Sequence, residues 1–539
     1  MVTSSLTRAM ASQTVAVVGA GPSGLSMLKQ LREDGFSVTG TTALLSKYTC
    51  GFSDYPMPEK YPIFLRSDQF QEYMEDYAKH FNTLSSWVFN TAVKRAFRNS
   101  DDTKWCLEVE TAGEIHTAEF DKVVFCHGYQ TKATVPEFEG QDEFEGIIMH
   151  SQQYRRPEPF AGKRVIVLGL SSTAADILPD ILPHAARPVY SAHRRGAVPF
   201  SRFRKGVPTD ALATWRRRQI THTLQAHFPE AVRVLGDIAI DLFIKFSYPN
   251  LKPEWRIRPV PSVSLKLPSA IVFDNILPRL EDGSLKSVHG IKRFLGPKRV
   301  ELLDGMILED IDAVILCTGY KAELSVMEGC VETSIPTTHG YSSAPDGGVP
   351  MYRLWMNLFP PRYADSLAML CYSAYGKSNG FSFADVTSMA VSNVFRGVHP
   401  LPSLTEMNKW VDEHHDWVAS RWKLERTVEP SMVKQCEFQR WLHEAAGTGM
   451  NNLSWMGWKG WKFWWNDRKM YNLMSNGIET AHMYRYFETG KRRTWDGARE
   501  AILKLEEERK RVLPMTPEQE KDYLVKLNVT RWKATSSSP

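Results

Sequence analysis

The sequence of 539 residues predicts an α/β fold with two nucleotide-binding domains, the second inserted into the first, and a helical C-terminal extension. Three observations support this prediction. An apolar run leads into a glycine-containing turn and a helical pattern twice, over residues 14–33 and 163–181. A further apolar run and glycine turn at 313–320 follow the second unit, as expected for an inserted domain. After about residue 400, helical patterns with dense charge take over.

Composition excludes several classes of protein. A formal net charge of +5 is small for this length, so we expect no nucleic-acid partner. The 43% hydrophobic content excludes a disordered chain. The seven cysteines are scattered and odd in number, which indicates no disulfide framework, no metal site and a reducing compartment. No run approaches the roughly 18–20 apolar residues of a membrane span, and no secretory signal is apparent. We expect no transmembrane segment and a cytoplasmic location.

The first unit predicts a Rossmann-like dinucleotide site. Its turn, G-A-G-P-S-G at 19–24, lies between an apolar strand and a helix and has the spacing G-x-G-x-x-G. Gly19 permits the tight turn, Gly21 lets the backbone approach a diphosphate, and Gly24 lets the helix pack on the strand. The diphosphate is expected at the helix N-terminus, where free N–H groups favour an anion.

One part of the usual pattern is missing from the first unit. An acidic residue normally stands about 20 residues after the turn, at the end of the second strand, and binds the ribose hydroxyls. Here F-S-V-T-G at 36–40 runs into Thr41 and Thr42 without an acid. Because this acidic residue is missing, the ribose hydroxyls would lose one contact, and we expect the dinucleotide to bind more weakly.

The second unit departs from the glycine pattern but has support further along the chain. Its turn is G-L-S-S-T-A at 169–174, with Ser171 in place of the middle glycine and Ala174 in place of the last. The next predicted strand ends in H-R-R-G at 193–196. Arginine there would bind a 2′-phosphate through paired hydrogen bonds and select NADPH over NADH. A solvated basic loop is the alternative.

A motif between the two units carries a resemblance to a known family. F-E-G-I-I-M-H-S-Q-Q-Y at 144–154 fits F-x-G-x-x-x-H-x-x-x-Y and resembles the signature of the flavin-containing monooxygenases. The segments F-S-D-Y-P at 52–56, D-A-V-I-L-C-T-G-Y at 312–320 and G-F-S-F-A-D-V at 380–386 are similar to other segments of that family. The resemblance extends over about 14–392.

The resemblance implies a domain order and a set of cofactor-binding residues. FAD would occupy the first domain and NADPH the second. The expected bounds are 1–155 and 306–400 for the two parts of the FAD domain, 156–305 for the NADP domain and 401–539 for the helical extension. In the FAD domain, Gly19, Gly21 and Gly24 would hold the diphosphate and Val93 the adenine, whereas Gly169, Thr173 and Arg194 would hold NADP. The other expected cofactor-binding residues are Pro22, Ser23, His150, Ser171, Thr318, Gly319 and Asp385. No catalytic residue is identified.

The resemblance also implies the chemistry. In such enzymes NADPH reduces the flavin, O2 adds to give a C4a-hydroperoxyflavin, and one oxygen atom passes to a nitrogen, sulfur or carbon centre of a small organic substrate. Tyr154 favours this reaction over Baeyer–Villiger oxidation, because the Baeyer–Villiger relatives usually have Trp at that position.

The chain departs from the family at three places, and the first two departures support a different hypothesis. An acidic residue and a G-G-x-W loop are missing between Gly40 and Thr41, Leu44 stands where an Asn contacts the flavin, and the first A-T-G turn is C-H-G at 126–128. The missing segment is either a real divergence or an artefact of the gene model. The alternative function is a degenerate, non-catalytic protein that binds NADP or an interaction partner.

The aromatic segment W-M-G-W-K-G-W-K-F-W-W at 455–465 leaves its role open. Packing over the catalytic domains, as a lid or a subunit contact in a homo-oligomer, is the simplest interpretation. A substrate channel and a membrane surface are the alternatives. Of the 16 tryptophans, 11 lie after residue 400, where the family resemblance does not explain the chain.

Overall fold

The structure is a computed structural model, and it describes residues 13–19, 21–33, 47–65, 67–128, 131–257, 262–266, 270–327, 329–342, 348–370, 372, 380–426, 428–454 and 456–535. The predicted strand at 36–40, the Gly40/Thr41 junction and Leu44 lie outside these residues. Among the described helices, none is long and apolar enough to cross a membrane.

The first sheet has three parallel strands in the order β1, β5, β22, which are Val15–Val18, Lys122–Phe125 and Leu367–Met369. Alternate residues of β1 point to opposite faces, and both faces are covered. Val15 and Val17 pack toward α2 (Pro22–Glu33) and α9 (Gly380–Phe395). Ala16 packs toward an antiparallel sheet made of β2, β3 and β4, which are Thr91–Arg98, Trp105–Thr111 and Glu114–Phe120. Burial on both faces explains why the sequence of β1 is continuously apolar.

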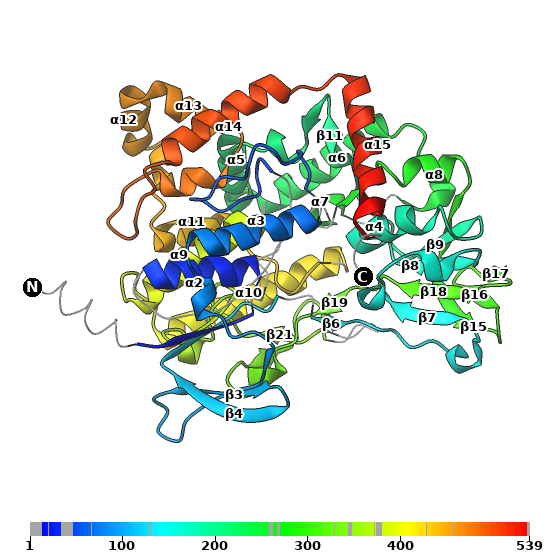
Figure 1. Ribbon diagram of the computed structural model, residues 1–539, viewed down its shortest axis with the longest axis horizontal. Helices are drawn as coiled ribbons and strands as arrows, with labels where there is room; N and C mark the ends of the chain where they lie inside the picture. Colours follow the sequence, from blue (N-terminus) through cyan, green and yellow to red (C-terminus); the bar gives the residue numbers. More distant parts are fainter. Residues whose placement is uncertain are drawn as a thin grey trace, which may run out of the picture.

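The second sheet has five parallel strands and lies at the right of Figure 1. Its order is β14 (Leu285–His289), β9 (Val189–His193), β8 (Val165–Leu168), β18 (Ala313–Leu316) and β7 (Ile147–His150). The chain enters this sheet from the first domain through β7 and leaves it through β18. The predicted domain bounds place both strands in the first domain, whereas both pair here with strands of the second. The bounds themselves stay a prediction.

Helices of the second region and several short ladders complete the fold. Those helices are α4 (Ser172–Ile181), α5 (Trp215–His227), α6 (Pro229–Ser247), α7 (Val263–Lys266) and α8 (Leu277–Glu281). A small antiparallel sheet is formed by β15, β16 and β17, at Ile291–Phe294, Val300–Leu302 and Ile307–Leu308. Four two-stranded ladders are also described. In two of them β6 (Lys132–Ala133) pairs with β19 (Tyr320–Lys321), and β10 (Pro199–Phe200) pairs with β13 (Ile271–Val272). In the other two β11 (Phe203–Arg204) pairs with β12 (Val207–Pro208), and β20 (Thr333–Ser334) pairs with β21 (Met351–Tyr352). Helix α3 (Ser67–His80) belongs to the first region.

The predicted helical character after residue 400 is confirmed. The helices are α10 (Leu404–Leu424), α11 (Gln435–Ala446), α12 (Trp458–Asn466), α13 (Arg468–Asn476), α14 (Ala498–Val512) and α15 (Pro517–Thr535). A capping box of Ser403 and Glu406 begins α10, and Gly447 in the left-handed conformation ends α11.

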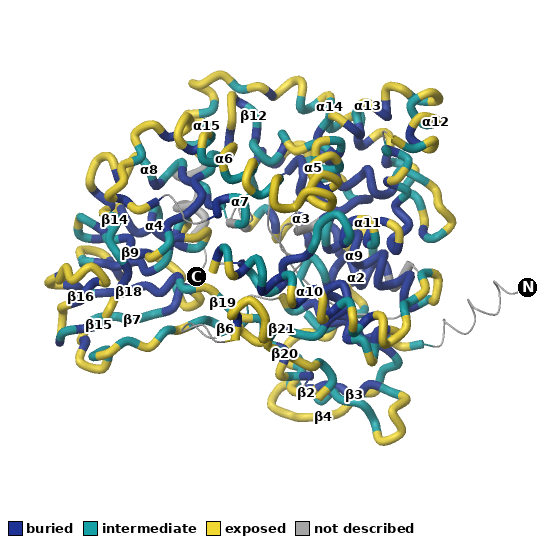
Figure 2. The backbone as a smooth tube through the Cα atoms, turned by 180° about the vertical axis from the view of Figure 1, so that it is seen from behind, coloured by how far each residue is buried: buried dark blue, intermediate teal, exposed yellow. Residues whose placement is uncertain are grey.

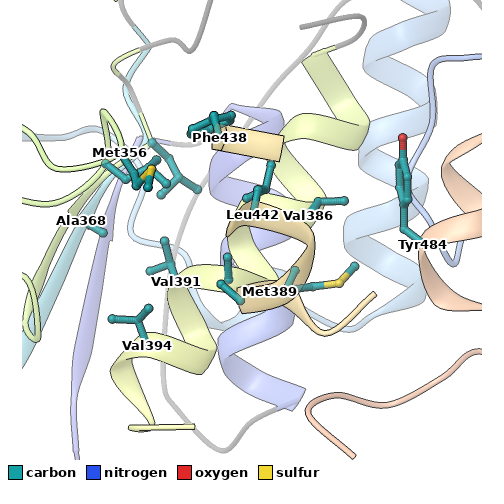
Figure 3. Packing of buried hydrophobic residues seen from close by; sticks show 14 of the residues in the cluster. Met356, Ala368, Val386, Met389, Val391, Val394, Phe438, Leu442 and Tyr484 are labelled. Carbon is teal, nitrogen blue, oxygen red and sulfur yellow. The ribbon is translucent and has the colours of Figure 1, made fainter. Parts of the chain in front are cut away.

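These helices share a hydrophobic core with the first domain. Phe438 and Leu442 of α11 lie beside Val386 and Met389 of α9, and all four side chains are buried (Figure 3). The same cluster contains residues of β1 and β22. Figure 2 shows that many residues of α2, α9 and α11 are buried and that the three helices lie in the same part of the molecule. The C-terminal region is therefore part of the folding unit that contains the first glycine turn.

Candidate functional site

The two glycine turns are built in the same way. β1 pairs with β5 and is followed by Gly19, and β8 pairs with β18 and is followed by Gly169. A Cβ atom on Gly19 would lie 2.5 Å from the backbone nitrogen of His127, and one on Gly169 would lie 2.3 Å from the carbonyl oxygen of Cys317. Both glycines have positive φ, +98° and +114°. A side chain at either position would push the neighbouring strand away, so these positions require glycine.

The first turn presents a helix N-terminus to its surroundings. Pro22 is the first residue of α2, and the backbone nitrogen of Leu25 donates to the carbonyl of Gly21 over 2.9 Å. Gly21, Pro22 and Ser23 are half-buried, whereas Gly24 is buried against the core. The first turn of a helix has N–H groups without helical acceptors, and its dipole favours an anion. The predicted diphosphate contact of these residues fits this geometry.

A cavity of about 630 Å³ begins at this turn. It lies between the first sheet and the antiparallel sheet of β2 to β4, and Gly19 and Val93 both line it. Pockets for cofactors and other small ligands measure roughly 300–1,000 Å³. Most of its wall is apolar, with aromatic side chains from Trp87, Phe89, Phe120 and Phe125. The position of Val93 fits the predicted contact with an adenine ring.

Two polar residues in the cavity wall come from segments far apart in the sequence. The Nε2 atom of His127 lies 3.1 Å from the carbonyl oxygen of Glu323, and burial lowers the pKa of this histidine. The carboxylate of Glu323 accepts from the backbone nitrogen of Ser325 over 2.9 Å and pairs with Lys132 over 3.1 Å. These contacts lower the pKa of Glu323 to about 2. Among the described lining residues, Glu323 is the only carboxylate. The position of Glu323 in this wall could not be predicted from sequence spacing, because the fold brings Glu323 to the cavity from a distant part of the chain.

His150 contacts another predicted cofactor residue. Its Nδ1 atom accepts from the backbone nitrogen of Gln152 over 3.1 Å, so Nε2 carries the proton and donates to the carbonyl of Gly319 over 3.1 Å. The same carbonyl accepts from the backbone nitrogen of Thr134, and Thr318 Oγ1 donates to the carbonyl of Thr134 over 2.5 Å. Burial lowers the pKa of His150, so the ring is neutral at pH 7. His150, Thr318 and Gly319 thus join the chain segments that connect the two domains.

The other fixed positions of the 144–154 motif also have structural roles. Phe144 is buried, with its ring 4.9 Å from that of Phe294. A Cβ atom on Gly146 would lie 2.5 Å from the Phe144 ring. Tyr154 donates to Asp180 of α4 over 2.6 Å. The motif that carried the family resemblance therefore shapes the junction between the domains.

The second turn explains both departures from the glycine pattern. Ser171 is the N-cap of α4 with φ of −132°, an extended conformation that needs no glycine. Its side chain is exposed and makes no capping hydrogen bond. Ala174 is fully buried, so its methyl group fills the contact between helix and sheet. Thr173 is half-buried in the first turn of α4. The turn leaves a helix N-terminus open, as at the first site.

Arg194 stands beside the second turn. It follows β9 directly, and the backbone nitrogen of Gly169 donates to the carbonyl of Ala192 over 2.8 Å, which joins the end of β9 to the turn. The Arg194 side chain is exposed, and its stem lies over Gly290. Within the part of the chain that the structure describes, Arg194 has no ion-pair partner. Turn and arginine lie at the carboxyl ends of parallel strands, where such sheets bind ligands.

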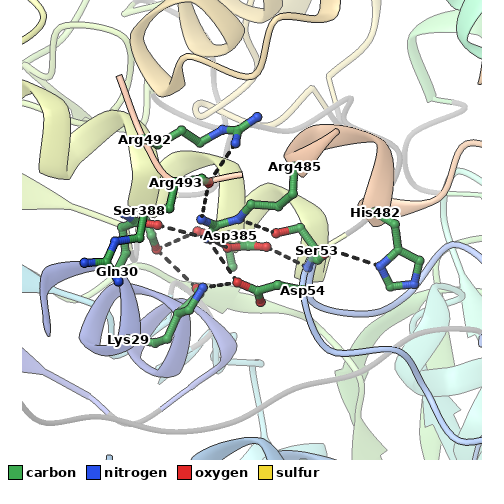
Figure 4. Close-up of polar contacts among 12 residues, drawn as sticks. Lys29, Gln30, Ser53, Asp54, Asp385, Ser388, His482, Arg485, Arg492 and Arg493 are labelled. Carbon is green, nitrogen blue, oxygen red and sulfur yellow. Dashed lines mark hydrogen bonds and ion pairs between the residues drawn. The ribbon is translucent and has the colours of Figure 1, made fainter. Parts of the chain in front are cut away.

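Asp385 lies in a buried polar cluster (Figure 4). Its Oδ2 atom accepts from the backbone nitrogen of Ser53 over 2.8 Å, and Oδ1 lies 3.6 Å from Arg485 Nη2. The side chains of Asp385 and Arg485 are 0% and 1% exposed. These contacts connect its carboxylate to the first domain through Ser53 and to the C-terminal region through Arg485. Binding of the cofactor by Asp385 stays a prediction. Asp385 does not line the cavity at Gly19.

Arg485 connects four segments within this cluster. Its Nε atom donates to Ser53 Oγ over 2.9 Å, and its Nη2 atom donates to Gln30 over 2.9 Å and lies 3.5 Å from Asp54. Asp54 also pairs with Lys29. Burial alone would raise the pKa of Asp54, but Arg485 and Lys29 outweigh burial and hold the pKa below its ordinary value. Sequence reasoning missed Arg485, because no motif marks it.

Comparisons with known proteins agree with these features. A family model described as flavin-binding monooxygenase-like matches residues 37–532. Monooxygenase aurF of Gibberella zeae is 36% identical over 93% of this chain and 98% of its own length. Flavin-containing monooxygenase 5 of Oryctolagus cuniculus is 28% identical over 92% of each chain. In fold, the chain resembles S-allyl-L-cysteine S-oxygenase from Allium sativum, with a TM-score of 0.54 and 19% identity over 92% of this chain and 98% of that one.

The predicted fold class, with two Rossmann-type domains and a helical C-terminal region, is confirmed by the structure and by this likeness. The family matched is one of enzymes that use FAD and NADPH. The glycine turns, the cavity at Gly19 and the exposed Arg194 fit those two cofactors. The chain belongs to the flavin-binding monooxygenase-like family.

Proposed function

We propose that this enzyme transfers one oxygen atom of O2 to a nitrogen, sulfur or carbon centre of a small organic substrate, at the expense of NADPH. The observation that carries the proposal is the pair of equivalent turns at Gly19 and Gly169, each at the carboxyl end of a parallel sheet. When bound, FAD that has been reduced by NADPH would supply the two electrons of the reaction, in which one oxygen atom of O2 enters the product and the other becomes water.

We also propose a cytoplasmic location, which the scattered cysteines support.

The first turn would hold FAD through backbone groups. The N-terminus of α2 would bind the diphosphate, and Gly19 lets the turn pack against His127, where a side chain would clash. The adenosine half would lie in the apolar cavity against Val93. An apolar wall excludes water from the ring and leaves the polar contacts to the ribose and the phosphates.

Glu323 would replace the acidic residue that the first unit lacks. A carboxylate that accepts from the two ribose hydroxyls is the usual partner at this place. Glu323 lines the same cavity as Gly19, and its pKa of about 2 keeps it ionised at neutral pH. Lys132 and Ser325 hold its side chain in place without covering all the acceptor positions of two carboxylate oxygens.

The second turn would hold NADPH. The open N-terminus of α4 would bind the diphosphate, and Arg194 would bind the 2′-phosphate. His150 would act on the cofactors indirectly, as a positioning residue that fixes the connection between the domains through Gly319. His150 has no free acceptor for a proton, because both ring nitrogens are bound.

Oxygen transfer can be tested with probes of each chemical class. The purified chain, loaded with FAD, is supplied with NADPH and ¹⁸O2 together with a thioether, a tertiary amine, a phenol or a cyclic ketone. The proposal predicts that at least one product gains a single ¹⁸O atom, because the other atom leaves as water. Oxidation of NADPH that yields only hydrogen peroxide with every probe, or a product that contains oxygen from water, would count against it.

A further inference from the structure

Helix α12 has three exposed tryptophans on one face. Trp458, Trp461 and Trp465 are 78%, 58% and 81% exposed. Their spacing of three and four residues places them along one stripe of the helix. Met456, which precedes the helix, is 75% exposed. Single exposed apolar side chains are ordinary, but a contiguous group of large ones marks an interaction surface.

The same helix is positively charged. Lys459 and Lys462 are exposed on α12, and no residue of the helix is acidic. Arg468 and Lys469 are exposed at the start of α13. The nearby Asp467 does not offset this charge, because it caps α13 through the backbone nitrogen of Met470 and pairs with Arg499.

The tryptophans are held on a rigid support. A Cβ atom on Gly460 would lie 1.6 Å from the carbonyl oxygen of Ser454, so one side of α12 is pressed against the preceding loop. Phe463 packs against Tyr486 and Phe487, with ring centroids 5.8 Å and 5.0 Å away. The simplest interpretation of this segment, packing on the domains, therefore accounts for Phe463. It leaves the three exposed tryptophans without a function.

We propose that α12 docks on an anionic lipid surface. Tryptophan is enriched at membrane interfaces, because its large ring is apolar and its N–H remains hydrated. Lysines beside the aromatic stripe would bind the anionic headgroups, as in helices that lie in the interface plane. The proposal concerns attachment at the surface and is independent of oxygen transfer.

Charge argues against a second copy as the occupant. A two-fold contact would place this surface against itself, because such an interface uses the same patch on both subunits. Lys459 and Lys462 would then face the lysines of the other copy, and no acidic residue of α12 could pair with them. An anionic lipid surface satisfies these lysines and the tryptophans together.

Vesicle sedimentation with the full chain tests this proposal. The protein is mixed with vesicles of phosphatidylcholine alone or with phosphatidylserine added, at low and high salt. We expect binding to the anionic vesicles that weakens with salt. Replacing Trp458, Trp461 and Trp465 together by Ser should lower the partition coefficient at least about tenfold, because three interfacial anchors are lost. The double variant K459E/K462E should lose the preference for anionic vesicles.

A matched control separates the helix from general surface apolarity. Ile115 is 63% exposed and belongs to β4, which lies at the lower edge of Figures 1 and 2, whereas α12 lies near the upper edge. The Ile115→Ser variant should bind vesicles as well as the unmodified chain does. All variants should have the same melting midpoint as the unmodified chain. Equal partition of the triple variant and the unmodified chain would overturn the proposal. So would absence of vesicle binding, or a dimer in light scattering that the triple variant abolishes.

Discussion

The Nε2 atom of His150 donates to the carbonyl oxygen of Gly319 over 3.1 Å. His150 ends β7, by which the chain enters the second sheet, and Gly319 follows β18, by which the chain leaves it. One hydrogen bond therefore joins the two crossings between the domains. The histidine of the 144–154 motif has a structural explanation that needs no contact with a cofactor.

Replacing His150 should cost stability more than cofactor affinity. In His150→Ala the backbone nitrogen of Gln152 loses its acceptor, and Gly319 keeps only the donor from Thr134. We expect the free energy of unfolding to fall by about 1–2 kcal/mol. Denaturant unfolding measures this loss, and NADPH titration of the same variant should give a dissociation constant within about twofold of the original. A large loss of NADPH affinity at unchanged stability would assign His150 to the cofactor instead.

Arg194→Ala should discriminate between the two nicotinamide cofactors. Loss of a charged hydrogen bond costs about 1.5–3 kcal/mol, so NADPH binding should weaken roughly ten- to a hundredfold. NADH lacks the 2′-phosphate, and its affinity should not change. Lys286→Ala is the control, because Lys286 is exposed on the neighbouring strand β14. Equal weakening for NADPH and NADH would remove the assignment.

Gly169→Ala should destabilise the fold beyond the cost of its backbone conformation. A Cβ atom there meets the carbonyl oxygen of Cys317 at 2.3 Å. Gly162 also has a positive φ, +68°, but has open space around it, so Gly162→Ala measures conformational strain alone, about 1–2 kcal/mol. We expect Gly169→Ala to exceed that loss in thermal unfolding. Similar melting midpoints for the two variants would show that the strand at Cys317 moves to accommodate the Cβ atom at no cost in stability.

Arg485→Met should be strongly destabilising. The substitution removes the Arg485 cation from the buried carboxylates of Asp54 and Asp385. Asp54 then keeps its ion pair with Lys29. Breaking a buried ion pair by removing one partner typically costs about 3–5 kcal/mol. Arg511→Met is the control, because its pair with Glu59 is exposed and should contribute at most about 1 kcal/mol. Equal effects of the two substitutions would contradict the role given to the cluster.

The same cluster predicts a dependence of stability on pH. The folded pKa of Asp54 is lowered, so its ionised form stabilises the native state above the unfolded pKa of about 3.9. This contribution to stability is lost as the pH falls from the unfolded pKa of Asp54 through its lower pKa in the folded protein. Unfolding midpoints of the unmodified chain should therefore decrease below about pH 4, and Arg485→Met should show a weaker decrease.

Sequence predicted the parts of the site that local geometry dictates. Gly19 and Gly169 could be recognised because a strand, a tight turn and a helix leave no room for a side chain. The contact between Asp385 and Arg485 could not be recognised, because it joins residues 100 positions apart through a core that spacing does not reveal. Glu323 reaches the cavity from a loop that follows the second domain. The shared core of α9 and α11 was likewise hidden, because an apolar helix face does not specify its partner.

The most direct test of the account is FAD binding by the purified chain, followed by flavin absorbance and titration. The account predicts a stoichiometric FAD complex that oxidises NADPH in air. Glu323→Gln should raise the dissociation constant of FAD about tenfold or more, since a charged hydrogen bond is lost, whereas Glu332→Gln, at an exposed side chain, should not change it. If the unmodified chain binds NADPH but no FAD even at high concentration, the enzyme assignment is contradicted and a non-catalytic NADP-binding protein is favoured. If FAD binds equally well to Glu323→Gln, only the role of Glu323 is wrong.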